Sequence, residues 1–319
     1  MADIDPGSFD LPPPEPNQAY IEVSALSAGL LRLPLRIFVS GSSPSDIAPD
    51  TPALSFFLRH SVTQKHLLFD LGIRRDIDTL SPAAQKRIRE LFSPRVSQTA
   101  DESLQKGGIR PEDITTVVLS HLHWDHIGDH APFTNAVFIL GPGSDELLQN
   151  AYPVNPDSLL LQASVPHDRT RILTPNDFHT SIGPFPRALD YFGDGSLYII
   201  DSPGHIDGHI NILARTSPDG QWIYLAGDSA HDIRVISGER DIAIHVDEHG
   251  HVTCGYADPD MAREHQRRIR QIALSPLVEV ILAHDWRWYE ANRGVRNVFF
   301  PGVIPPTNTG TKYFETRQF

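Results

Sequence analysis

The 319-residue sequence contains a single cysteine, and this shortage excludes several kinds of site. Cys254 has no partner for a disulfide within the chain and cannot supply the cysteine pair of a structural zinc site. Any bound metal must therefore use histidine and carboxylate ligands. The sequence also lacks an apolar run near the 18 residues that a membrane-spanning helix needs, so no membrane partner is expected.

Positive charge is scarce as well, with 27 basic against 40 acidic residues and a formal net charge of −13. Such a surface repels a phosphate backbone unless basic residues form a patch. The arginines of residues 263–270 share a helical pattern typical of a solvated helix face, so no nucleic-acid partner is expected. The N-terminus has no basic region followed by an apolar run, which predicts a cytoplasmic protein without a secretory signal. The sequence does not predict the oligomeric state.

What remains is the composition of an ordinary folded protein, with 40% hydrophobic and 21% charged residues. Five prolines within residues 1–19 predict an extended N-terminal arm that either packs over the body or stays mobile. Residues 20–319 are predicted to form a single domain.

Short runs rich in β-branched and aromatic residues predict the strands, of which the first four are expected to be antiparallel neighbours. These runs cover residues 20–25, 33–39, 53–60, 66–71, 114–120, 136–140, 197–200, 210–214, 222–226 and 278–283. Periodic segments predict helices over residues 83–92, 100–106, 144–150 and 260–274. Strands and helices do not alternate strictly, unlike those of a doubly wound sheet.

The chemistry concentrates in a histidine cluster that directly follows the apolar run 114–120. Residues 120–128 read Ser-His-Leu-His-Trp-Asp-His-Ile-Gly and place four potential ligands within six positions: His121, His123, Asp125 and His126. Imidazole and carboxylate groups suit zinc and related divalent ions, and a loop at a strand end can direct alternate side chains toward two centres. The alternative is a polar turn with incidental histidines.

Three further segments end an apolar run with a potential ligand. They contribute Asp201 and His205 in Asp-Ser-Pro-Gly-His, Asp228 after Ala-Gly, and His284 after Leu-Ala. Strand ends of this kind converge when the strands belong to two facing sheets whose ends line one edge of a sandwich.

The HxHxDH motif at 121–126, together with His205, Asp228 and His284, resembles the metallo-β-lactamase superfamily from about residue 20 onward. This resemblance implies an α/β (α+β) fold, the αββα four-layer sandwich. It also implies two divalent metal ions, with zinc as the expected metal. One ion would take His121, His123 and His205, the other would take Asp125, His126 and His284, and Asp228 would bridge them.

The surrounding residues are most similar to the N-acyl-homoserine lactonases, whose activity is known as quorum quenching. The resemblance implies a hydrolase that opens a lactone, and general metal chemistry supplies an activated bridging hydroxide and a polarised carbonyl. Asp125 is a candidate catalytic residue that orients the hydroxide or protonates the leaving group. A thioesterase of the glyoxalase II-like type, a phosphodiesterase and a non-catalytic binding protein are the alternatives.

His231 departs from the lactonase pattern, which has a tyrosine three residues after the bridging aspartate. It is a second candidate catalytic residue, able to donate to a substrate carbonyl as the tyrosine would, and the alternative is an exposed loop histidine. After His284, we expect Trp286 to line the substrate pocket and Trp288 to pack in the core.

Overall fold

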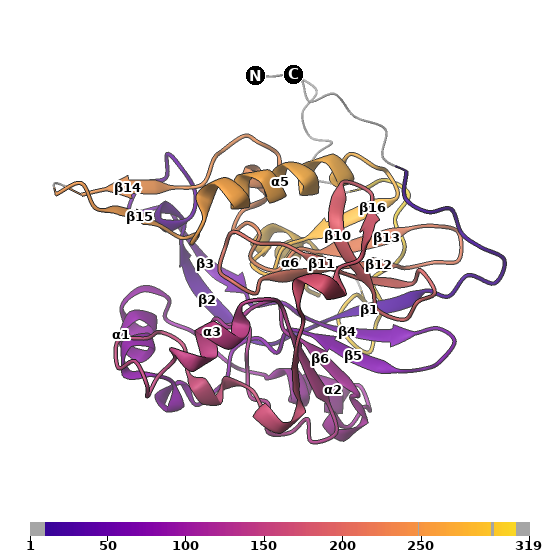
Figure 1. Cartoon of the computed structure of the whole chain (residues 1–319), viewed down its shortest axis with the longest axis horizontal. Coiled ribbons are helices and arrows are strands. Elements are labelled where there is room, and N and C mark those ends of the chain that lie inside the picture. The colour runs from indigo at the N-terminus through magenta and orange to yellow at the C-terminus, as the bar shows by residue number, and fades with distance from the viewer. Residues whose placement is uncertain (1–9, 248, 295–296, 311–319) are drawn as a thin grey trace.

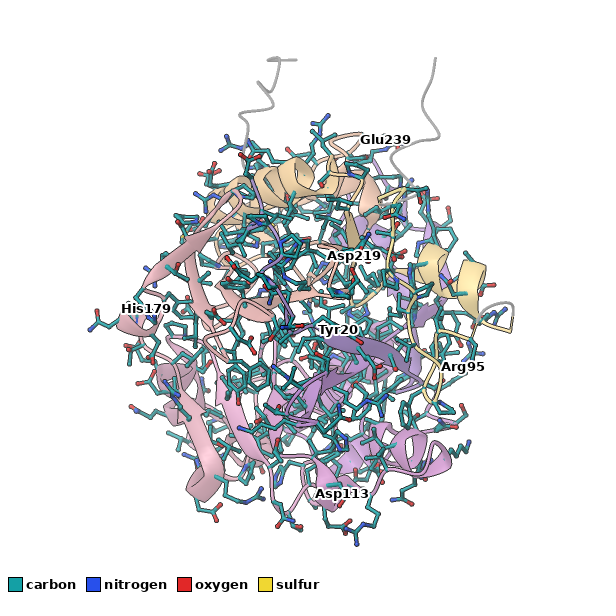
Figure 2. All side chains as sticks on the ribbon, turned by 90° about the vertical axis from the view of Figure 1, so that its right-hand side faces the viewer. Tyr20, Arg95, Asp113, His179, Asp219 and Glu239 are labelled. Carbon is teal, nitrogen blue, oxygen red and sulfur yellow. The ribbon has the colours of Figure 1, made fainter. Side chains whose placement is uncertain are left out.

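The computed structural model describes residues 10–247, 249–294 and 297–310. Two mixed six-stranded sheets face each other, and helices cover the outer face of each sheet (Figure 1). The predicted αββα four-layer sandwich is therefore confirmed. In Figure 2, Asp113 beside the first sheet and Glu239 beside the second lie at opposite ends of the molecule.

The first sheet has the order β1-β4-β5-β6-β7-β8. β1, β4 and β5 pair antiparallel, whereas β5, β6, β7 and β8 run parallel. Its strands are β1 (Ile21–Leu26), β4 (Ser55–His60), β5 (His66–Phe69), β6 (Thr116–Val118), β7 (Val137–Leu140) and β8 (Thr170–Ile172).

The second sheet has the order β16-β13-β12-β11-β10-β9. Only β13 and β16 pair in parallel; the other neighbours are antiparallel. Its strands are β9 (Thr180–Ile182), β10 (Phe185–Asp190), β11 (Leu197–Asp201), β12 (Ile210–Arg215), β13 (Trp222–Leu225) and β16 (Val278–Ile281).

Alternation along the strands builds three apolar layers. Leu67 and Phe69 point between the sheets, whereas Leu68 points toward the helices, and Ile212 and Leu213 divide in the same way in the second sheet. Because side chains of a strand alternate between faces, a strand covered on both sides must be apolar throughout. This explains the continuous apolar runs that predicted these strands.

Helices α1 (Pro82–Leu91), α2 (Ala100–Lys106) and α3 (Ser144–Gln149) contribute to the core on the outer face of the first sheet. Helix α5 (Pro259–Ala273) covers the second sheet, where α4 (Ile233–Ile236) also packs. Helix α6 (Trp286–Asn292) begins two residues after His284, with Asp285 as its N-cap. The four helices predicted from periodicity are thus present with boundaries within one residue.

One strand prediction was partly wrong. The run 33–39 was expected to join the first sheet, but the strand β2 (Leu30–Pro34) pairs with β3 (Ile47–Pro52) in a separate ribbon. A 3₁₀ turn at Leu35–Ile37 follows, because Pro34 has no backbone N–H to continue a ladder. The prolines of β3 hid that strand from sequence analysis, since they are rare within sheets.

A second ribbon, β14 (Ile244–Val246) with β15 (Val252–Cys254), projects from the body at the left of Figure 1. Ile244, Val246 and Val252 are exposed on it. Within the described residues, no helix is long and apolar enough to cross a membrane.

The described part of the predicted N-terminal arm, residues 10–19, contains no helix or strand and packs on the body. Pro12 O accepts a hydrogen bond from the buried Arg215 at 2.9 Å, and Gln18 Nε2 donates to Asp194 O at 2.8 Å. Residues 1–9 of the arm lie outside the described residues.

Gly72 provides a test of how closely this fold is packed. Its φ is +69°, and a Cβ there would lie 2.3 Å from Ala28 Cβ and 2.4 Å from Ala28 O. We expect Gly72→Ala to lower the free energy of unfolding by on the order of 3 kcal/mol, measured by urea denaturation, because backbone strain and a backbone clash add. Gly193→Ala is the control: its φ is +74° but no atom lies within 4 Å, so a loss of only about 1 kcal/mol is expected. Equal losses would contradict the packing argument.

Candidate metal centre

Four loops meet at one edge of the sandwich. The loop after β6 carries the histidine motif, and the loops after β11, β13 and β16 carry His205, Asp228 and His284. The structure brings all seven sequence-predicted metal-ligating residues together. Asp201, also singled out in the sequence, is not among them and pairs with Arg187 at 2.8 Å instead.

The first cluster consists of His121, His123, His205 and Asp228, whose candidate ligand atoms lie within 4.8 Å of one another. His123 Nδ1 is 2.8 Å from His121 Nε2 and 2.9 Å from His205 Nε2. Asp228 Oδ2 is 3.7 Å from His121 Nε2 and 3.4 Å from His205 Nε2. Ligand atoms around a tetrahedral zinc ion lie roughly 3.4 Å apart, so these distances match one ion.

The second cluster consists of Asp125, His126 and His284. His284 Nε2 is 3.4 Å from Asp125 Oδ2 and 3.4 Å from Asp228 Oδ1. His126 Nε2 is 3.2 Å from the same Asp228 oxygen. Asp228 therefore directs Oδ2 toward the first cluster and Oδ1 toward the second.

Unpaired polar atoms mark the point where the clusters meet. Among the described residues, His126 Nε2 and Asp228 Oδ1 are buried and have no hydrogen-bond partner. An unsatisfied buried polar group costs about 1–3 kcal/mol, and a cation between these atoms would remove that cost. Together with the nitrogen and carboxylate donor set, this makes the two clusters consistent with a dinuclear metal site.

Contacts behind the clusters fix the orientation of the histidine rings. His126 Nδ1 is 2.8 Å from Asp70 Oδ2, and His284 Nδ1 donates to Pro52 O at 2.8 Å, so the Nε2 atoms face the site. Asp70 also accepts hydrogen bonds from the backbone and side chain of Ser120, at 2.6 and 2.8 Å. Asp228 N donates to His209 Nε2 at 3.0 Å.

Asp70 was missed by sequence analysis, although a signal existed. It follows β5 directly and ends an apolar run with a carboxylate, as Asp228 does after β13. His209, which also supports the site, follows His205 by four residues.

The electrostatics divide the histidines into two groups. Burial lowers the pKa of His123 to about 4 and also lowers the pKa of His121 and of His205 well below the ordinary value. These rings are neutral near pH 7, as a metal ligand must be. Burial also acts on His284, but the carboxylates of Asp228 and Asp125 outweigh it and raise the pKa to about 10. The carboxylates of the second cluster therefore favour a positive charge at this position, and a bound metal ion would take the place of the proton on His284.

His231 lies beside the clusters with 2% of its surface exposed, so the alternative of an exposed loop histidine is wrong. Its Nε2 is 3.1 Å from Asp228 Oδ2, and its Nδ1 is 3.1 Å from the hydroxyl of Tyr256. Its ring stacks on Phe38 with centroids 3.7 Å apart. Sequence analysis missed Tyr256, which no motif marks.

A cavity of about 260 Å³ opens onto the clusters. Its floor includes His123, Asp125, Asp228, His231 and His284, and apolar side chains form most of its walls: Leu33, Phe38, Ile88, Phe92, Trp124, Leu159 and Ile206. Trp286 was predicted to line the substrate pocket, but it is absent from the described lining of this cavity. Trp288 is buried in the core, as expected. The cavity suits a small, largely apolar molecule with a polar group at the clusters.

Among curated proteins, the chain is 32% identical over 293 residues to a protein named cytochrome P450 monooxygenase mpaDE from Penicillium roqueforti. The match covers 85% of this chain and 34% of that protein, so the chain spans about a third of its length. A protein named gamma-lactamase MBL2 from Gibberella moniliformis is 36% identical over 169 residues, which are 52% of this chain and 70% of that protein.

Among solved structures, an N-acyl homoserine lactone hydrolase with the product N-hexanoyl-L-homoserine at its catalytic metal center superposes with a TM-score of 0.67 at 18% identity. The superposition covers 89% of this chain and 99% of that chain, and at this identity it is evidence of the shared fold alone. Residues 54–217 match the sequence profile of the metallo-beta-lactamase superfamily. The chain belongs to the metallo-β-lactamase superfamily.

Proposed function

We propose that the chain is a dinuclear metal-dependent hydrolase that opens the ring of a small lactone carrying an apolar substituent, of the N-acyl-homoserine lactone type. One observation carries the proposal. The two oxygens of Asp228 face two separate clusters of histidine and aspartate side chains at the floor of an apolar cavity.

One ion would be held by His121, His123 and His205. The other would be held by Asp125, His126 and His284, and Asp228 would contact both ions. Bound there, two divalent ions such as zinc would activate a water molecule and polarise the scissile carbonyl. No serine or cysteine nucleophile is then required. The apolar walls would bind the substituent of the substrate and exclude bulk water, which strengthens the electrostatic interactions at the floor.

Asp125 is placed to handle a proton at the bond that breaks. It lines the cavity, and its Oδ2 faces His284 in the second cluster. A carboxylate with one oxygen committed to a cluster retains a second oxygen that can accept a proton from the attacking water and return it to the leaving oxygen.

A γ-lactam is the second candidate substrate, because the gamma-lactamase MBL2 is 36% identical to the aligned part of this chain. Lactones and lactams present the same cyclic carbonyl, and they differ in the leaving atom. An amide nitrogen must be protonated as it leaves, so lactam opening depends more strongly on a proton donor such as Asp125.

The deciding experiment combines metal analysis of the purified protein with turnover of matched γ-lactones and γ-lactams that carry the same acyl chain. We expect about two divalent ions per chain, ring opening of the lactone, loss of activity after chelation and recovery with added metal. Preferred turnover of the lactam would replace the first candidate with the second. Turnover of thioesters or phosphodiesters alone, or no hydrolysis by metal-loaded protein, would overturn the proposal.

Asp125→Asn tests the proton-transfer role. The amide keeps the size and an oxygen ligand but cannot accept the proton, so we expect kcat to fall by about 10²–10⁴-fold for the preferred substrate. Metal content, measured in the same preparation, should stay near that of the unsubstituted protein. Full turnover with both metals bound would contradict this role.

Asp70→Asn tests the support behind His126. Loss of the carboxylate that accepts from His126 Nδ1 should weaken metal binding by about 10–100-fold in a chelator competition assay, since such partners fix the ring and raise its basicity. Asp194→Asn is the matched control, because that carboxylate pairs with His60, which lies outside the clusters. An unchanged metal affinity in Asp70→Asn would contradict the ligand role of His126.

A further inference from the structure

We propose that His231 and Tyr256 form a hydrogen-bond relay that holds Asp228 in its bridging orientation, with Tyr256 acting on the centre only through His231. Both are positioning residues. The inference rests on the proposed metal centre, because Asp228 is its central carboxylate.

The chain of contacts is continuous and buried. Tyr256 Oη lies 3.1 Å from His231 Nδ1, and His231 Nε2 lies 3.1 Å from Asp228 Oδ2. The exposed fractions of Tyr256, His231 and Asp228 are 3%, 2% and 2%. Hydrogen bonds in such surroundings are little weakened by water, so they hold their geometry well.

The proton positions along the relay follow from the chemistry of its end groups. An ionised carboxylate can only accept, so His231 Nε2 must carry the hydrogen that points to Asp228. Nδ1 of the neutral ring is then an acceptor, and the phenol of Tyr256 donates to it. Tyr256 therefore selects the imidazole tautomer that donates to Asp228, as partners of buried histidines commonly do.

Both ring nitrogens of His231 are thus engaged, and neither has a hydrogen left for a substrate carbonyl. The ring is also fixed by stacking on Phe38 at an interplanar angle of 13°. A ring that is fixed at both nitrogens and on one face is better suited to orient the neighbouring Asp228 than to contact a substrate whose shape and charge change during the reaction.

The backbone on either side of Tyr256 fixes the far end of the relay. Ala257 N donates to His205 O and Asp258 N donates to Gly204 O, both at 2.9 Å. On the other side, Gly255 packs so closely that a Cβ would lie 2.6 Å from Phe38 Cδ1. The segment 254–258 therefore ties Tyr256 to the loop that carries His205.

Asp228 needs this support at its side chain. Its backbone N–H is held by His209 Nε2, but that contact leaves the carboxylate free to turn about its own side-chain bonds. The hydrogen bond from His231 occupies a second lone pair of Oδ2 and restricts that rotation, which keeps Oδ1 directed at His126 and His284.

A double-mutant cycle of Tyr256→Phe, His231→Phe and the double variant tests the relay, with metal affinity in a chelator competition assay as the readout. We expect Tyr256→Phe to weaken metal binding by about tenfold, by analogy with other groups behind metal ligands. The double variant should bind metal as His231→Phe does, because a residue that acts only through another adds nothing once that residue is gone. This readout needs no substrate, so it stands apart from any failure of the lactonase assay.

Tyr191→Phe is the matched control, because it removes one hydroxyl that contacts Thr116 Oγ1 at 3.0 Å, outside the clusters. It should leave metal affinity unchanged. Wild-type affinity in Tyr256→Phe, or additive losses in the double variant, would overturn the relay. If His231→Phe does not fold, His231→Leu replaces it in the cycle.

Discussion

The carboxylate of Asp228 is the junction on which the rest of the site depends. Its two oxygens face two clusters whose members come from both sheets, and its backbone is held by His209. A single side chain can serve both clusters only if the loops after β6, β11, β13 and β16 end within a few ångströms of one another. The sandwich supplies this condition, because its strand ends meet along one edge.

Rigidity of the site follows from the apolar layers beneath it. The ligand loops leave strands that are almost entirely buried: every residue of β6 and β13 is buried, and β11 and β16 each have one half-buried residue. Behind the loops, Asp70 and Ser120 hold the histidine motif through buried hydrogen bonds. Such a frame holds the ligand side chains in fixed positions, which a metal-dependent hydrolase of this superfamily needs.

Much of this was predictable from the sequence, because the ligands of the histidine motif are local and those of the other loops follow apolar runs. The helices were predictable for the same reason, since α1 and α5 have clear periodicity and an initial proline. Tyr256 carries no such signal. Its role depends on a hydrogen bond with His231, 25 residues away in the chain, and on the packing of the neighbouring Gly255 against Phe38, more than 200 residues away, which no local pattern encodes. The β3 strand was hidden because its prolines resemble those of a loop.

The tip and the base of the projecting ribbon β14–β15 differ in how closely they are packed, and so in how far their sequence and length can vary. At its tip, Gly250 has no atom within 4 Å of a would-be Cβ, whereas at its base Gly255 presses against Phe38. Insertions or deletions at the tip would therefore alter the reach of the ribbon without displacing Tyr256. The reach of the ribbon can therefore diversify while the base of the ribbon, from Cys254 to Ala257, keeps its place in the cavity wall.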